Sequence, residues 1–306
     1  MKTLTMLILL LVASIAPAQL KIVTTATDYA DLARQIGGDK VTVQSIMRGP
    51  ENVHNVLAGP TEMVKLNKAD LFVHSGLDTE PWRDNLVRGA RNAKIVEGNP
   101  SWVDMSVGIT LRDVATGATD RSKGDMHAYG DPHFTMNLPN GMRMVATLTR
   151  AMAEVDPSNA DFYRENARKL VTEFAEMNKE LRAKLDPLGG LKIVTFHRAW
   201  GYFADSMGLS IVDTIEPHVG ITPSPGEVVS LIERMRAQGV KIVVCETYND
   251  RKLAQSIADK VGAVMIVLPD HVLGVPEVKS YQQLFRYNVD KLIDAAKAAG
   301  IEPRSP

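Results

Sequence analysis

Two series of short strand-like runs, separated by a long stretch without one, constrain the fold of this chain most. The first series begins with KIVTTATD at 21–28 and includes AKIVEG at 93–98, and the second begins with KIVTFH at 192–197. Within each series, helical or loop segments separate the apolar runs, as they do in βαβ units with parallel strands. We therefore expect an α/β protein of two lobes, each a mainly parallel sheet with flanking helices.

The stretch at 140–187 predicts helix instead of strands. Asp156-Pro157-Ser158 interrupts it, and Pro157 suits the first turn of a helix. Beyond this break, apolar side chains recur mostly every three or four residues, the period of an amphipathic helix. They are Phe162, Leu170, Phe174, Met177 and Leu181. Such a helix would span roughly 40 Å, about the length of a domain, so we expect one long helix to join the two lobes.

The first residues have the layout of a cleavable secretory signal peptide. Lys2 precedes an apolar run that ends at the small residues Ala16-Pro17-Ala18. This run is too short to span a membrane, and no later stretch is long and apolar enough to do so. The expected organisation is a signal peptide at 1–18, an N-terminal lobe at 19–139, a linking helix region at 140–187 and a C-terminal lobe at 188–306.

Composition excludes several classes of protein. Cys245 is the only cysteine, so the chain has no intrachain disulfide and no lipid-attachment cysteine near the expected cleavage site. The formal net charge of −1 gives no electrostatic basis for binding nucleic acid. We therefore expect a freely soluble, monomeric protein of the periplasm.

Four of the seven histidines occupy positions typical of a binding site. His197 and His271 follow strand-like runs, and His54 and His133 lie in loops that lead from strand-like to helix-like sequence. In open α/β sheets, ligands bind at the carboxyl ends of strands, where such loops converge. Because neutral imidazole suits zinc, copper and nickel, the pattern indicates a transition-metal site.

The other three histidines are weaker candidates. His74 ends the run DLFVH beside small residues, and His218 lies in a turn-like segment, EPHVG. We expect neither to bind metal directly, because a lone histidine is more often a satisfied polar residue. His127 lies six positions before His133 in the Gly/Asp-rich segment GDMHAYGDPHF.

Four blocks resemble, in the right order, the zinc/manganese-binding periplasmic solute-binding proteins of ABC metal-uptake transporters, the ZnuA/TroA-like family. The blocks are PENVHNVLAGPTEMVKLNKADLFVHSGLDTEPW, GDPHF, VTFHRAWGYFADSMGL, and IVLPDHVLG followed by SYQQLFRYNVDKL. The resemblance covers essentially all of the mature chain. It implies metal ligands at His54, His133 and His197, contributed by both lobes.

The resemblance leaves the fourth ligand open between two neighbours. His271 falls in the family's aspartate column when one counts back from Gly274, whereas Asp270 matches by residue type. If the strand continues through them, their side chains point to opposite faces, so we do not expect both to bind. Chemistry slightly favours Asp270, and Glu246 in VVCETY is a distant third candidate.

The chain departs from the family around the second block. The family's long His/Asp-rich loop is nearly absent, and only Asp125, His127 and Asp131 remain to attract metal. We expect His127 to be an auxiliary loop ligand that the primary site can lose. After His133 the sequence reads FTMNLP where the family has Trp-Leu-Asp-Pro, which loosens the register there without changing the histidine.

Three histidines and one oxygen form a closed tetrahedral zinc shell. Members of the family that prefer manganese often carry an acidic residue where His197 stands, so the resemblance favours Zn(II) over Mn(II). It implies that the protein captures the ion between its lobes and delivers it to an inner-membrane ABC permease, while the long helix limits closure to a small tilt. Protonation of the histidines should weaken binding below about pH 6.

Four other functions stay open. They are a manganese-preferring homologue, a periplasmic metal chaperone that meets no permease, a protein that binds an organic or chelated ligand, and a secreted zinc hydrolase. A hydrolase needs an open metal position and a general base, for which Glu216 or Glu246 would have to serve. The chain has no HExxH motif and no nucleophile elbow, so we expect a binding protein and not an enzyme.

Overall fold

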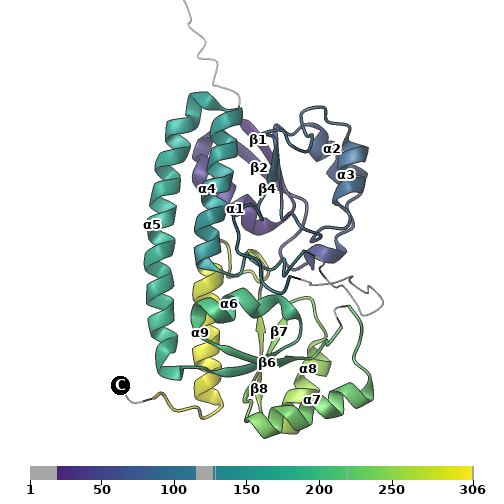
Figure 1. Ribbon diagram of the computed structural model, residues 1–306, viewed down its shortest axis with the longest axis vertical. Helices are drawn as coiled ribbons and strands as arrows, with labels where there is room; N and C mark the ends of the chain where they lie inside the picture. The colour runs from purple at the N-terminus through teal and green to yellow at the C-terminus, as the bar shows by residue number, and fades with distance from the viewer. Residues whose placement is uncertain (1–18, 115–126, 128, 219, 305–306) are drawn as a thin grey trace, which may run out of the picture.

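The computed structural model describes residues 19–114, 127, 129–218 and 220–304, so the predicted signal peptide at 1–18 lies outside the described residues. Two sheets lie toward opposite ends of an elongated molecule, and one long helix runs beside both (Figure 1). This arrangement confirms the predicted α/β class with two lobes. Among the described residues, no helix is both long enough and apolar enough to cross a membrane.

The N-terminal sheet has four parallel strands in the order β2-β1-β3-β4. The strands are β1 (Leu20–Thr24), β2 (Val41–Ser45), β3 (Leu71–His74) and β4 (Trp102–Asp104), and the helices of this lobe are α1 (Thr27–Gly37), α2 (Pro60–Asn67) and α3 (Arg83–Ala90). Short 3₁₀ turns lie at Gly38–Lys40 and Val53–Asn55.

The apolar run AKIVEG at 93–98 forms turns and not a strand. Arg91 ends α3 in a left-handed conformation, and the side-chain amide of Asn92 donates to the carbonyls of Leu66 and Ala69. These bonds hold the chain in a turn, and Ile95 is the one residue of 93–98 whose side chain is buried. The edge of the sheet beside β3 is therefore taken by the next apolar segment, β4.

The C-terminal sheet repeats the same parallel topology, in the order β6-β5-β7-β8. Its strands are β5 (Lys192–Thr195), β6 (Ser210–Thr214), β7 (Ile242–Glu246) and β8 (Val264–Leu268), with helices α6 (Gly201–Met207), α7 (Pro225–Gln238) and α8 (Arg251–Val261). In each sheet the strand order reverses beside the first strand, so the topological switch points lie between β1 and β3 and between β5 and β7. Such points are where open α/β sheets bind ligands.

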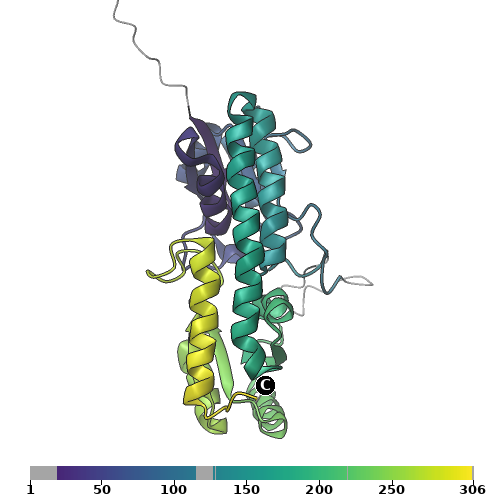
Figure 2. The same ribbon diagram turned by 90° about the vertical axis from the view of Figure 1, so that its left-hand side faces the viewer.

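Two helices, α4 (Leu138–Val155) and α5 (Ala160–Leu185), occupy the predicted linking region, with a 3₁₀ turn at Pro157–Asn159 between them. They lie side by side, and α9 (Tyr281–Ala298) packs against the lower half of α5 (Figure 2). The 26 residues of α5 extend over about 39 Å, which is enough to pass both sheets. The domain limits at 139/140 and 187/188 stay predictions.

The buried face of α5 differs from the predicted stripe at its first member. Tyr163, Ala167 and Leu170 begin the buried series, which continues through Phe174, Met177 and Leu181. Phe162 is instead 39% exposed, because it lies one position, or about 100° of helix rotation, before Tyr163. The structure thus places Tyr163, and not Phe162, on the helix face that meets the core.

One hydrophobic core runs through both lobes and the helices beside them. It includes Ile22 and Val73 of the first sheet, Ile193 and Val244 of the second, and Phe174 of α5. A smaller core fills the outer face of the second sheet, under α7 and α8. Because close-packed interiors resist shear, the shared core supports the expectation that the lobes close by a small tilt.

Candidate metal centre

Three imidazole rings meet between the two lobes. Nε2 of His133 lies 3.3 Å from Nε2 of His54 and 3.3 Å from Nε2 of His197. With zinc–nitrogen bonds of about 2.0–2.1 Å, tetrahedral geometry puts two ligand nitrogens about 3.3 Å apart. Among the described residues, no other three histidine, cysteine or acidic side chains come this close.

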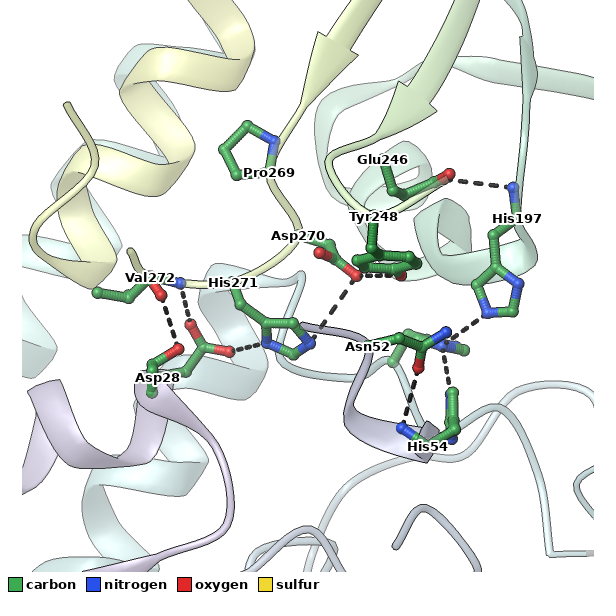
Figure 3. Close-up of polar contacts among 12 residues, drawn as sticks. Asp28, Asn52, His54, His197, Glu246, Tyr248, Pro269, Asp270, His271 and Val272 are labelled. Carbon is green, nitrogen blue, oxygen red and sulfur yellow. Dashed lines mark hydrogen bonds and ion pairs between the residues drawn. The ribbon is translucent and has the colours of Figure 1, made fainter. Parts of the chain in front are cut away.

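Local structure brings each ring to this point. His54 lies in the 3₁₀ turn after β2. The backbone N–H of His54 donates a hydrogen bond to the side chain of Asn52 at 2.9 Å (Figure 3). His197 directly follows the extended end of β5. His133 lies in the loop that leads into α4. His54 and His133 thus come from the N-terminal lobe, and His197 comes from the switch point of the other lobe.

The second nitrogen of each ring faces an oxygen. His54 Nδ1 lies 2.9 Å from the carbonyl of Thr79, and His133 Nδ1 lies 2.8 Å from Oδ1 of Asp131. His197 Nδ1 lies 3.5 Å from Oε2 of Glu216. An oxygen at Nδ1 holds the hydrogen there and leaves the lone pair on Nε2. All three rings are therefore oriented to present Nε2 to one point.

These supporting roles could not be read from the sequence alone. Asp131 had a local signal, because it stands two positions before His133 in GDPHF and also accepts from the backbone N–H of His133 at 2.9 Å. Glu216 was considered only as a possible general base. The carbonyl of Thr79 has no signal in the sequence, because every residue has a carbonyl and only the fold selects this one.

The surroundings give the three rings different pKa values. Burial, with the neighbouring histidines, holds the pKa of His54 well below its ordinary value. Burial also lowers the pKa of His133, although Asp131 acts against it. At His197 burial acts in the same direction but is outweighed by Glu216, Glu246 and Asp270, so its pKa is raised. In the metal-free protein His197 is thus the ring that holds a proton most readily.

The two candidates for the fourth ligand lie past the end of a strand. β8 ends at Leu268, and Pro269 follows, so the strand does not continue through Asp270 and His271, and the expectation of opposite faces does not apply to them. His271 Nε2 is instead 3.8 Å from Oδ2 of Asp270 (Figure 3). Neither side chain belongs to the close group that the three histidines form.

Asp270 and His271 differ in how fully the protein satisfies them. Tyr248 donates its hydroxyl to Oδ2 of Asp270 at 2.7 Å, but Oδ1 is buried without a hydrogen-bond partner. His271 Nδ1 donates to Oδ2 of Asp28 at 2.6 Å. Burial disfavours the charged imidazole, yet Asp270 and Asp28 raise the pKa of His271 to about 9. An unpaired buried carboxylate oxygen is costly, and a cation would satisfy it.

His127, which we expected to be an auxiliary loop ligand, lies close to the ring of His54. Its ring centroid is 4.9 Å from that of His54, and its Nδ1 is 3.0 Å from Oδ1 of Asp78. Its Nε2 is buried and has no hydrogen-bond partner, although the residue lies outside the close group. Asp125, the other predicted remnant of the loop, lies outside the described residues.

Neither His74 nor His218 belongs to the close group of three rings. His74 packs against Trp102 with ring centroids 4.7 Å apart, and its Nδ1 accepts from the backbone N–H of Gly76 at 3.0 Å. Burial and the positive charge of Arg83 lower its pKa to about 3, so it is a neutral core residue. His218 lies in the turn after β6, with its carbonyl bonded to the N–H of Ile221.

Glu246 has no oxygen free for a metal or a substrate. Oε1 accepts from the backbone N–H of His197 at 3.3 Å and from Trp200 Nε1, while Oε2 accepts from Asn249 at 2.7 Å. Burial raises its pKa to about 7. Glu246 therefore supports the strand end behind His197, and the predicted roles as a ligand or a general base do not fit these contacts.

Known metal-transport proteins resemble this chain along most of its length. A family model described as "Zinc-uptake complex component A periplasmic" matches residues 22–295. A putative metal-binding protein of Treponema pallidum is 26% identical over 90% of this chain and 87% of its own length. The manganese ABC transporter substrate-binding lipoprotein PsaA of Streptococcus mitis is 24% identical over 90% and 89%.

Solved structures share the fold over nearly the whole chain. A crystal structure of ZnuA superposes with a TM-score of 0.75 at 25% identity and covers 90% of this chain and 99% of its own. A manganese-bound variant of a periplasmic metal-binding protein from Candidatus Liberibacter asiaticus has a TM-score of 0.74 at 23% identity, with coverage of 90% and 99%. The second of these likenesses concerns the fold only.

Proposed function

The chain belongs to the family of periplasmic zinc-uptake complex component A, and from this premise we propose that it captures Zn(II) between its lobes and delivers it to an ABC permease. Members of this family are substrate-binding proteins of metal ABC transporters and not enzymes. Metal binding for an ABC transporter is thus the established part. The zinc preference, the ligands and the handover are the proposal.

The observation that carries the proposal is that Nε2 of His133 lies 3.3 Å from Nε2 of His54 and 3.3 Å from Nε2 of His197. Each of these nitrogens is already oriented by an oxygen at Nδ1, so little reorganisation would be needed to accept a metal ion. We assign Asp270 as the fourth ligand, because it holds a buried, unpartnered carboxylate oxygen. His271 is the weaker candidate, since its Nδ1 is already bonded to Asp28.

Zinc is favoured over manganese by the chemistry of this donor set. Imidazole nitrogens suit zinc, whereas manganese prefers harder oxygen ligands. Three imidazoles and a carboxylate form the closed four-coordinate shell that zinc adopts in proteins. Relatives named for manganese and for iron make the metal the first property to test.

We propose that the mature protein is freely soluble in the periplasm. Its only cysteine, Cys245, is buried in β7 and is far from the N-terminal segment. Relatives such as the iron-transporter protein MtsA of Streptococcus pyogenes are named as lipoproteins. Phase partitioning of the protein from the membranes of its host distinguishes a soluble form from a lipid-anchored one.

Elemental analysis of protein purified without added metal, combined with competitive titration against a chromophoric chelator, tests the metal assignment. We expect one equivalent of zinc in the wild type and a loss of tight binding in His197→Ala. Tighter binding of manganese than of zinc would overturn the zinc preference and leave the transport function in place. Protein that binds no transition metal would overturn the proposed function itself.

A further inference from the structure

The segment that follows β8 is bonded to the opposite lobe. Asp28, in the first turn of α1, accepts from Nδ1 of His271 at 2.6 Å with one oxygen and from the backbone N–H of Val272 at 2.8 Å with the other (Figure 3). Thr27 donates its hydroxyl to the carbonyl of Val272 at 2.6 Å. The Asp28 side chain is fully buried. Thr27 and Asp28 of the N-terminal lobe are thus bonded to the segment that follows β8, at His271 and Val272.

Backbone packing reinforces these bonds. Gly49, in the loop after β2, lies so close to Leu273 that a Cβ at Gly49 would come within 2.1 Å of the carbonyl carbon of Leu273. Leu273 itself has a left-handed backbone, with φ of 64°. Residues 271–273 are therefore attached to the N-terminal lobe by two separate contacts, although they continue from a strand of the C-terminal sheet.

Asp270 lies between two opposing attachments. Tyr248, from the loop after β7, holds its Oδ2 at 2.7 Å, whereas Asp28 holds the next two residues from the other side. The Asp270 carboxylate keeps Oδ1 buried and unpartnered. Its position between the lobes therefore depends on both attachments, and only the one through Asp28 crosses from the N-terminal lobe, which also carries His54 and His133.

We propose that Asp28 is a positioning residue for the metal site, which holds Asp270 in place between the lobes and thereby sets how long the bound ion is retained. This inference rests on the proposed function. Capture does not need Asp28, because the three Nε2 atoms converge without it. Release of the ion requires Asp270 to move away from it. The bonds of Asp28 to His271 and Val272 restrain the segment that carries Asp270. Loss of Asp28 should therefore act on the dissociation rate of zinc and not on its association rate.

Asp28→Asn is the variant that tests this role, because it keeps the size of the side chain and one acceptor for Val272. Asp31→Asn is the matched control. Asp31 lies on the same helix and also accepts a backbone N–H from the C-terminal part of the chain, but its partner is Tyr281, at the start of α9. Stopped-flow measurement of zinc association, and of release to excess chelator, gives both rates for each protein.

We expect Asp28→Asn to release zinc roughly 10- to 100-fold faster than the wild type, the range typical of lost metal-site support. Its association rate should be unchanged, and Asp31→Asn should match the wild type in both rates. An equal acceleration in Asp31→Asn would overturn the proposal, because any bond between the lobes would then do the same. Wild-type release rates in both variants would overturn it too.

A double-mutant cycle with Asp270→Asn separates positioning from general stability. If Asp28 acts through Asp270, Asp28→Asn changes the release rate little in a protein that already carries Asp270→Asn. Additive effects would overturn the positioning role. If Asp28→Asn does not fold, Thr27→Val removes the neighbouring bond to Val272, and an unchanged release rate in that variant overturns the proposal. Wild-type protein that binds no zinc would instead refute the proposed function.

Discussion

Nε2 of His54 and Nε2 of His133 lie 3.3 Å apart, although 79 positions separate the two residues in the chain. Both belong to the N-terminal lobe, and each ring is fixed by an oxygen at Nδ1. Half of the proposed shell is therefore assembled within one lobe, and His197 completes the close group from the other. An ion can meet three nitrogens before the fourth ligand reaches it.

Replacing His133 by alanine should abolish tight zinc binding. Its Nε2 is the one that contacts both of the other rings. We expect a loss of affinity of more than about 100-fold, the upper end of what loss of a supporting partner costs. His218→Ala, in the turn after β6, is the control and should bind as the wild type does. Competitive titration with a chelator measures all three proteins.

His127→Ala should retain one tight equivalent of zinc. The ring packs against His54 but lies outside the close group. We therefore expect a modest loss of affinity from weaker support of His54, with an unchanged stoichiometry in the same titration. A stoichiometry that falls to zero would make His127 a ligand of the primary site.

Asp270→Asn should weaken zinc binding more than His271→Gln does. The aspartate offers an unpartnered carboxylate oxygen, and the amide keeps its shape but loses the charge. In the second variant the glutamine side chain would still be able to donate to Asp28. We expect at least about tenfold lower affinity for the first variant, because charged oxygen ligands contribute directly to the shell. The reverse order of affinities would assign the fourth position to His271.

Zinc affinity should begin to fall at a higher pH than unperturbed histidines predict. Zinc binds neutral imidazole, so proton competition begins as pH falls toward the highest pKa in the set. That pKa belongs to His197, which Glu216 and Glu246 raise above 6.5 against the effect of burial. His54 and His133, with lowered pKa values, stay neutral to lower pH. We therefore expect the onset above the pH of about 6 that unperturbed histidines give.

Glu216→Gln tests this assignment. Removal of the carboxylate beside Nδ1 should lower the pKa of His197, and so move the onset of proton competition to lower pH. Glu227→Gln, at a half-buried residue at the start of α7, is the control. Calorimetric titration in two buffers of different ionisation enthalpy counts the protons released at each pH. An identical pH profile in Glu216→Gln and the wild type would contradict the assignment.

Gly49→Ala should destabilise the protein where the two lobes meet. The added Cβ would lie within 2.1 Å of backbone atoms of Leu273, which cannot move without the tied segment. Overpacking of this kind costs about 1–3 kcal/mol. Gly226→Ala, where the Cβ would meet no atom within 4 Å, should be neutral. Thermal melts of the metal-free proteins compare the two, and equal melting temperatures would contradict this account of the contact.

The sequence by itself determined the class of fold and most of the site. Strand-like runs in two series, with a strandless stretch between them, predicted two parallel sheets and a long helix, because hydrophobic period and chain breaks are local properties. The resemblance singled out His54, His133 and His197, and the structure brings these three rings together. The sequence did not show that 93–98 forms turns or that Tyr163, and not Phe162, faces the core. Both depend on which apolar segments and side chains pack together in the folded chain.

Only the tertiary structure decided what surrounds those rings. The carbonyl of Thr79 and the carboxylates of Asp131 and Glu216 fix the three tautomers, and no local pattern identifies a carbonyl as a partner. β8 ends before Asp270 and His271, and His271 is bonded to Asp28, some 243 positions away. Periodicity describes the faces of one element, whereas contacts between distant segments exist only once the chain has folded.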